Sequence, residues 1–144
     1  MNRSTERAPL ELLALLHAAH AAEAEIEARL DGIGLSMAKL MALQALADAG
    51  DPMPLGQLAQ RLSCVKSNIT QLVDRLETDG LVARRPDARD RRTKLAALTP
   101  AGRKACEQGA KVRREAERGL LGRLSADEAK QLGALVAKVG RARK

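Results

Sequence analysis

The fold of this chain is decided by residues 58–99, LAQRLSCVKSNITQLVDRLETDGLVARRPDARDRRTKLAALT. Two short helices are predicted at 55–62 and 66–79, separated by a break at residues 63–65, and the second is ended by Gly80. Apolar residues recur in the second helix at i, i+4, i+7, i+8 and i+11, which is the stripe of a helix buried on one side. They are Val65, Ile69, Leu72, Val73 and Leu76.

The other face of this second helix carries short polar side chains and cations, which suit base edges and phosphates in a DNA major groove. They are Lys66, Ser67, Asn68, Thr70, Gln71 and Arg75. We expect these side chains to contact DNA. For Arg75, pairing with a neighbouring carboxylate (Asp74, Glu77 or Asp79) is an equal alternative.

An arginine-rich hairpin follows, with strands expected at 81–85 and 91–98 around a turn at 86–90. Its tip holds Arg89, Arg91 and Arg92, and folding alone explains such a cluster poorly because like charges repel. A narrow minor groove, with its enhanced negative potential, explains it better than a merely solvated tip. Thr99 and Pro100 then predict a helix start, as an N-cap followed by proline at the first helical position. The layout of two helices and a basic hairpin is that of a winged helix-turn-helix.

These residues resemble the MarR family of bacterial transcriptional regulators. The resemblance is carried by residues 68–77, 80–82, 90–92 and 98–102, with the sequences NITQLVDRLE, GLV, DRR and LTPAG. It implies a mainly α fold with a small β-hairpin wing, built from an N-terminal dimerisation helix (1–35), a winged helix-turn-helix (36–100) and C-terminal dimerisation helices (101–144). Outside 58–102 the similarity is one of helical layout.

The resemblance also implies how such a protein would bind DNA. Asp90 would brace Arg92 so that the arginine enters the minor groove; stabilisation of the hairpin alone is the alternative. The first and last helices would intertwine across a two-fold axis and form a homodimer. Two recognition helices would then enter successive major grooves about 34 Å apart, on a roughly palindromic operator. Bound there, the chain would block access of the polymerase and act as a repressor by default, although members of the family can also activate.

The flanking helices are predicted at 9–30, 36–49 and 100–121, and a last one begins at Ser125, where Glu128 completes a capping box. Ser36 is the expected N-cap of the second of these. Leucines lie nearly all the way round the first turns of the N-terminal helix, which is more than the core of a monomer needs. They are Leu10, Leu12, Leu13, Leu15 and Leu16.

Composition supports a duplex-DNA partner. The 144-residue chain has a net charge of +7, and residues 81–102 hold six basic and two acidic side chains. Residues 103–144 hold twelve and five, although a basic C-terminal helix pair could equally be only solvated. The chain has no Phe, Tyr or Trp on which single-stranded bases could stack. It has no run of eighteen apolar residues and no visible signal peptide, so we expect a cytoplasmic protein without a membrane partner.

A small-molecule effector, anionic or apolar, is the expected signal. By the resemblance, its pocket would lie between the dimerisation helices and the winged domain and could include His17, His20, Met37 and Met41. The histidines could instead pack in the core or an interface, and the methionines could be core filler. We find no convincing set of three or four metal ligands and expect no metal or other cofactor.

The two cysteines raise the question of redox control. Cys64 lies just before the second helix, where the helix dipole could lower its pKa, but a small residue buried in a turn is the favoured interpretation. Thiol-based peroxide sensors of the resembled family have a reactive cysteine near the start of the first helix and tyrosine partners, and this chain has neither. Cys106 is expected to be structural.

The leading function is therefore a sequence-specific regulator of transcription that binds duplex DNA and is released by a small molecule or a redox signal. The alternative is a protein-interaction module of the same fold without specific DNA binding. An enzyme is not expected, because no glycine-rich phosphate loop, paired carboxylates or nucleophile–base arrangement can be placed in one pocket.

Overall fold

The structure is a computed structural model, and it describes residues 8–62 and 68–140. Two helices, α1 (Ala8–Asp31) and α2 (Met37–Ala49), precede a short strand β1 (Met53–Pro54) and helix α3 (Leu55–Arg61). Helix α4 (Ile69–Thr78), strands β2 (Val82–Pro86) and β3 (Lys94–Leu98), and helices α5 (Pro100–Leu121) and α6 (Ala126–Val139) follow. The expected fold class, mainly α with a winged helix-turn-helix, is confirmed.

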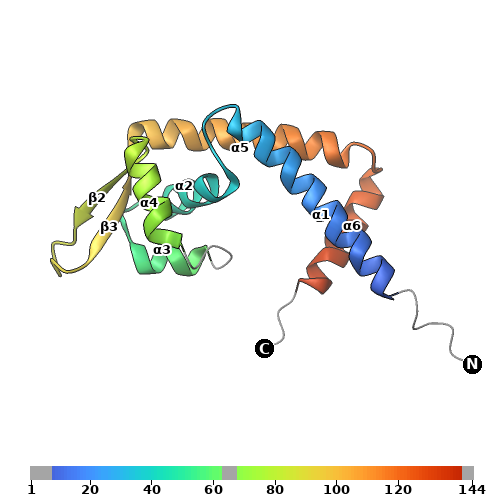
Figure 1. Ribbon diagram of the computed structural model, residues 1–144, viewed down its shortest axis with the longest axis horizontal. Coiled ribbons are helices and arrows are strands. Elements are labelled where there is room, and N and C mark those ends of the chain that lie inside the picture. Colours follow the sequence, from blue (N-terminus) through green and yellow to red (C-terminus); the bar gives the residue numbers. More distant parts are fainter. Residues whose placement is uncertain (1–7, 63–67, 141–144) are drawn as a thin grey trace, which may run out of the picture.

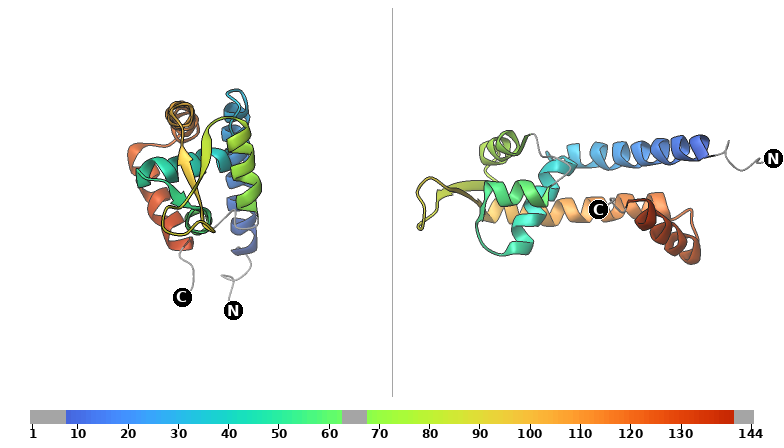
Figure 2. Two further views of the ribbon diagram at one scale, coloured as in Figure 1. Left: turned by 90° about the vertical axis from the view of Figure 1, so that its left-hand side faces the viewer. Right: turned by 90° about the horizontal axis from the view of Figure 1, so that it is seen from below.

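The molecule is elongated (Figure 1). Helices α2, α3 and α4 form a winged lobe with the hairpin at one end, and α5 runs from this lobe toward α6 at the other end. Helix α1 packs along α5, and a second view shows the hairpin projecting beyond the lobe (Figure 2). None of the helices within the described residues has the length and hydropathy needed to cross a membrane.

The hairpin is part of a three-stranded antiparallel sheet in the order β1-β3-β2. Val82 pairs with Leu98 and Pro86 with Lys94, while Met53 of β1 pairs with Ala96 on the other edge of β3. Strand β1 was not predicted from the sequence, because a two-residue strand shows no alternation of apolar and polar residues. Because β1 pairs with β3, it holds one end of the wing against the lobe.

The core is built without aromatic residues. Helix α2 lies at its centre and buries Leu40, Ala42, Leu43 and Leu46. The apolar stripe of α4 packs in the same cluster through Leu72, Val73 and Leu76, as the spacing predicted. Close packing of aliphatic side chains therefore carries the hydrophobic stabilisation of the lobe.

The predicted helix starts are confirmed where the structure describes them. The side chain of Ser36 accepts a hydrogen bond from the Lys39 backbone, and that of Thr99 accepts one from Gly102. Ser125 and Glu128 form the expected capping box. The hydrogen bond from the Ser125 backbone lowers the pKa of the Glu128 carboxyl below its ordinary value.

Gly102 sits where α5 crosses the end of the sheet. A Cβ atom at this position would overlap the backbone carbonyl of Leu81, which cannot move without disturbing the turn before β2. Thr99 stabilises the same junction with two hydrogen bonds. Its hydroxyl donates to the carbonyl of Gly80 (2.7 Å), and its backbone N–H donates to the carbonyl of Leu81 (3.1 Å).

We expect Gly102→Ala to lower the free energy of unfolding by about 1–3 kcal/mol, because the added methyl group forces the backbone to shift. Urea denaturation at a fixed protein concentration measures this change. Gly56→Ala is the matched control, since a Cβ atom there meets open space within a helix, and it should be neutral or slightly stabilising. Equal stabilities of the two variants would contradict the packing described.

Candidate nucleic-acid interface

The outward face of α4 collects most of the side chains predicted to read DNA. Asn68, Thr70, Gln71 and Arg75 are exposed, while the apolar stripe of the helix faces the core. Asn68, Gln71 and Arg75 line one cavity of about 170 Å³ against Ala38 of α2, so the three polar side chains lie together. The two other predicted contacts, Lys66 and Ser67, lie outside the described residues.

Arg75 does not pair with any of the three carboxylates considered as its partners. Within the described residues, Asp74 and Glu77 pair with Arg84, and Asp79 pairs with Lys39. The Arg75 side chain is exposed and forms no ion pair with a described residue, so its charge remains available to a phosphate.

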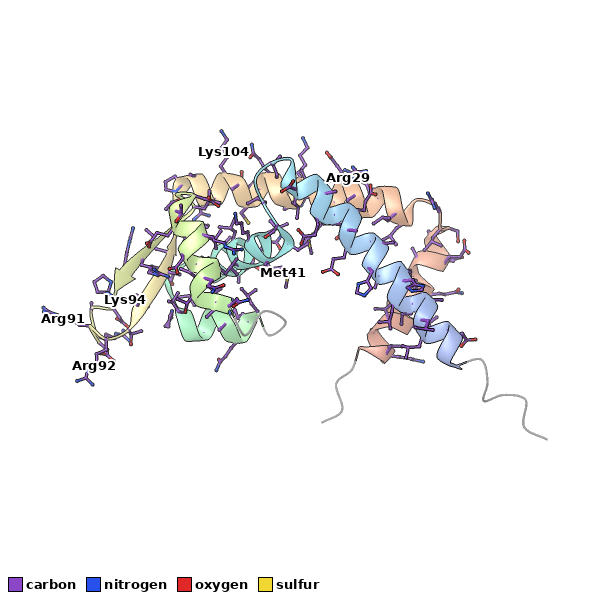
Figure 3. The ribbon with its side chains drawn as sticks, viewed as in Figure 1. Arg29, Met41, Arg91, Arg92, Lys94 and Lys104 are labelled. Atoms are coloured by element: carbon purple, nitrogen blue, oxygen red, sulfur yellow. The ribbon has the colours of Figure 1, made fainter. Side chains whose placement is uncertain are left out.

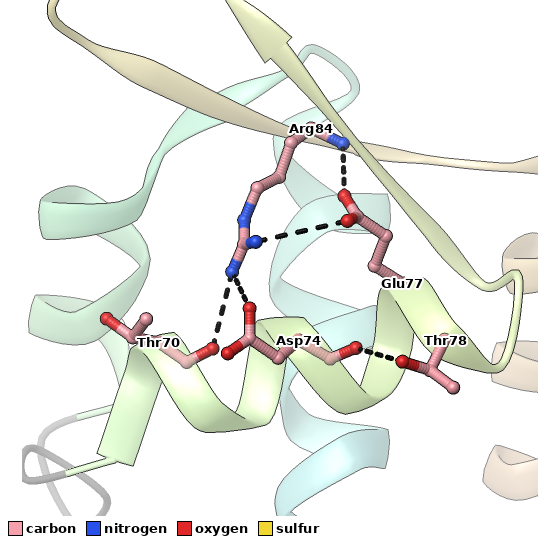
Figure 4. Close-up of polar contacts among 5 residues, drawn as sticks. All are labelled: Thr70, Asp74, Glu77, Thr78 and Arg84. Carbon is pink, nitrogen blue, oxygen red and sulfur yellow. Dashed lines mark hydrogen bonds and ion pairs between the residues drawn. The ribbon is translucent and has the colours of Figure 1, made fainter.

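Arg84, on β2, joins the wing to α4 (Figure 4). Its guanidinium forms an ion pair with Asp74, lies 3.9 Å from a carboxylate oxygen of Glu77 and donates to the carbonyl of Thr70 (3.4 Å). Its backbone N–H donates to the other oxygen of Glu77 (3.1 Å). Arg84 thereby fixes the angle between hairpin and helix and neutralises two carboxylates that would otherwise repel DNA.

Loss of this contact should weaken DNA binding without unfolding the lobe. We expect Arg84→Met, which keeps much of the side-chain bulk, to lower affinity for a specific duplex about tenfold, because the carboxylates of Asp74 and Glu77 then face the phosphates uncompensated. Fluorescence anisotropy measures the affinity. As a control, Asp74→Asn and Glu77→Gln are added to Arg84→Met, and we expect this triple variant to bind DNA again. Unchanged affinity in Arg84→Met alone would show that the contact is dispensable.

The wing turn is held by the carboxylates of two aspartates, which accept hydrogen bonds mainly from backbone atoms. Asp87 accepts from the N–H of Arg89 (3.0 Å), and Asp90 accepts from the N–H of Arg92 (3.0 Å) and the hydroxyl of Thr93 (3.4 Å). Asp90 thus holds Arg92 through its backbone N–H and not through its guanidinium. Entry of the Arg92 side chain into the minor groove stays a prediction. The arginine side chains are left to extend outward.

Arg91 and Arg92 project from the tip of the hairpin into solvent (Figure 3). They are exposed, as is Arg89, and none of the three forms an ion pair with a described residue. The geometry thus presents three unpaired cations beside the polar face of α4, on an arm that Arg84 fixes to that helix. A helix in the major groove with an adjacent basic arm in the minor groove is a known way of binding duplex DNA.

Comparison with known proteins agrees with this geometry. The MarR family profile matches residues 33–93. HTH-type transcriptional regulator YkoM of Bacillus subtilis is 31% identical over 107 residues, which cover 74% of this chain and 69% of YkoM. The chain belongs to the MarR family. The proteins of this family are transcriptional regulators and not enzymes.

Two further relatives extend the comparison. Transcriptional activatory protein BadR of Rhodopseudomonas palustris is 40% identical over 76 residues, but the match spans only 43% of BadR and 51% of this chain. The crystal structure of a mutant MarR from E. coli complexed with operator DNA superposes with a TM-score of 0.80 and 26% identity, covering 98% of this chain and 100% of that one.

In this MarR-family chain, the residues predicted for an effector pocket separate into two places. Met37 and Met41 line an open cavity of about 550 Å³ together with Arg61 and Arg113. His17 and His20 do not; they are exposed on α1, and the nearest carboxylate to His20 is Glu23 (3.9 Å). Within one chain the two histidines therefore do not line the cavity that holds Met37 and Met41, and their part in an effector pocket stays a prediction. The described residues contain no group of three or more metal-ligating side chains.

Cys106 is a buried free thiol, as expected for a structural residue. Burial raises the pKa of the Cys106 thiol, and the carboxylates of Asp48 and Glu107 raise it further, so the reactive thiolate is disfavoured. Cys64 lies outside the described residues.

Arg84 and Lys39, which pair with carboxylates on α4 and at its C-terminal end, are not among the site residues predicted from the sequence. A signal was present: three carboxylates (Asp74, Glu77 and Asp79) lie on or beside a helix expected to approach phosphates. In the structure Arg84 pairs with Asp74 and Glu77, and Lys39 pairs with Asp79.

Proposed function

We propose that this protein is a homodimeric, sequence-specific transcriptional regulator that represses by occupying a palindromic operator in duplex DNA. The proposal rests on one observation, that an ion pair of Arg84 with Asp74 holds two surfaces together. These surfaces are the polar face of α4 and the wing, which has Arg89, Arg91 and Arg92 at its tip. Polar side chains on a recognition helix supply base readout, and the wing cations supply attraction to the backbone and minor groove.

Exposed apolar side chains support the homodimer. On α1, Leu12 and Leu13 are 54% and 50% exposed, and on α6, Leu135 and Val139 are 59% and 68% exposed. No residue of α6 is buried, although the helix is amphipathic. An isolated helix of this length is marginal in water, so α6 needs a partner surface, and a second copy of the chain supplies the matching leucines of α1.

The cavity beside Met41 supports control by a small anionic ligand. It lies between α2, α3 and α5, and its lining holds two cations, Arg61 and Arg113, and one carboxylate, Asp48, beside apolar side chains. The Arg113 Nε atom is buried and forms no hydrogen bond with a described residue, although a carboxylate oxygen of Glu117 lies 3.4 Å away. Another nitrogen of the same guanidinium donates to the side chain of Gln44 (3.0 Å). A carboxylate on an apolar ligand would pair with Arg61 and would compete with Glu117 for Arg113.

In vitro selection from a randomised duplex library tests the function. We expect the full chain to enrich one inverted repeat whose half-sites are centred about 10 base pairs apart, since two recognition helices must meet one face of the DNA. Transcription from a promoter that overlaps the selected sequence should fall when the protein is added. Failure to enrich any sequence over the starting library would instead favour a protein-interaction module.

A further inference from the structure

An ion pair joins α2 to the far end of the recognition helix. The Lys39 Nζ atom lies 2.8 Å from Oδ2 of Asp79, the residue that caps the C-terminus of α4. The Lys39 side chain is only 19% exposed, the lowest value among the side chains that form ion pairs in the described part of the chain. The lysine end of this contact is therefore shielded from solvent, whereas the Asp79 side chain is 40% exposed.

Asp79 needs this partner for a second reason. A carboxylate at the C-terminal end of a helix faces the negative end of the helix dipole, which destabilises it. Lys39 compensates that repulsion and holds the end of α4 against the first turn of α2. The pair thus fixes the end of the recognition helix opposite to Asn68.

The same turn of α2 is also tied to α1. The Glu27 carboxylate of α1 accepts a hydrogen bond from the Met37 backbone N–H (3.0 Å), the first residue of α2. The connection between the helices is a tight turn in which Leu35 N–H donates to the Leu30 carbonyl (2.9 Å) and Gly34 has a φ of 75°. The first turn of α2 therefore contacts both α1, which carries the exposed leucines, and the end of α4.

We propose that Lys39 is a positioning residue that transmits the placement of α1 to the recognition helix, and so sets the separation and rotation of the two recognition helices in the dimer. Glu27 holds the start of α2 against α1, and Lys39 holds the end of α4 against the same turn. Without Lys39, α4 keeps its packing but gains freedom to rock about its buried stripe. The inference rests on the proposed function.

DNA affinity measured on duplexes with altered spacing between the two half-sites tests this role. The probes are the duplex selected by the wild-type protein and two derivatives with one base pair added or removed at its centre. We expect the wild-type protein to bind the derivatives at least about tenfold more weakly, because each base pair changes both separation and rotation. Lys39→Met keeps the apolar stem of the side chain. It should reduce the spacing discrimination, which is the ratio of the affinities for the selected duplex and for its derivatives, to about threefold or less.

Exchanging the charges of Lys39 and Asp79 should restore what Lys39→Met loses. In Lys39→Asp with Asp79→Lys, the aspartate lies in the first turn of α2 and the lysine at the C-terminus of α4, both favourable positions for the helix dipole. This double variant should recover the wild-type spacing discrimination. Arg29→Met is the matched control, because it removes an exposed ion pair with Glu25 within α1 and should change nothing.

The outcomes separate this inference from the proposed function. A lower spacing discrimination in Lys39→Met, with unchanged salt dependence and the same helical circular dichroism, would support the positioning role and exclude a phosphate contact. Wild-type discrimination in Lys39→Met, or a charge-reversed variant that behaves like Lys39→Met, would overturn it. A wild-type protein that binds the selected and scrambled duplexes equally would overturn the proposed function and this inference with it.

Discussion

A double substitution in α6, Leu135→Asp with Val139→Asp, is expected to convert the protein to a monomer and to weaken binding to its operator by more than about 100-fold. These two side chains are among the most exposed apolar groups of the described chain and lie one helical turn apart. In the proposed dimer they are buried, so two aspartates would place unpaired charges in an apolar interface. Each half-site would then be bound separately, without the gain from a second linked contact.

Sedimentation velocity gives the oligomeric state, and anisotropy gives the affinity. The matched control is Ala134→Asp with Ala137→Asp, which adds the same charge to the opposite face of α6. We expect it to remain a dimer with DNA affinity within about threefold of wild type. A wild-type protein that sediments as a monomer, or a variant changed at Leu135 and Val139 that remains dimeric, would contradict the assignment of this face.

Replacing Arg89, Arg91 and Arg92 together by glutamine should lower DNA affinity about 100-fold near physiological salt. The three side chains are exposed at the wing tip, and none pairs with a described carboxylate, so their charges are free to neutralise phosphates. Each phosphate neutralised contributes about 0.9 to the slope of log affinity against log salt concentration. The slope should therefore become shallower by about 2 to 3 for each wing that engages DNA.

A variant that loses three positive charges elsewhere distinguishes the effect of the wing on DNA affinity from the effect of net charge. Lys104, Lys111 and Arg114 are exposed on α5, and Lys104 lies well away from Arg91 and Arg92 (Figure 3). Their replacement by glutamine should leave the salt slope nearly unchanged. Equal losses in the two triple variants would mean that the wing acts through long-range charge alone.

Much of the fold could be predicted from the sequence because its signals are local. The stripe of Leu72, Val73 and Leu76, the caps at Ser36 and Thr99, and the capping box at Ser125 each depend on a few consecutive residues, and the structure contains them all. Strand β1 could not be predicted, since two residues pair only because β3 lies beside them.

The candidate site was predictable in part for the same reason. The exposed face with Thr70 and Gln71 follows from helical periodicity and the charged wing tip from the turn sequence. Arg84 and Lys39 act through partners on other elements, 10 and 40 residues distant along the chain, and local patterns do not show such pairs. The placing of His17 and His20 outside the cavity likewise depends on the direction in which α1 leaves the lobe.

Competition anisotropy on the selected duplex tests the central claim most directly. The wild-type protein is titrated onto labelled duplex, with the unlabelled selected or scrambled duplex as competitor, over a range of salt concentrations. The structure predicts a preference for the selected duplex of about 10³-fold or more, together with a steep salt dependence. Equal and weak affinity for the two duplexes at every salt concentration would contradict sequence-specific DNA binding.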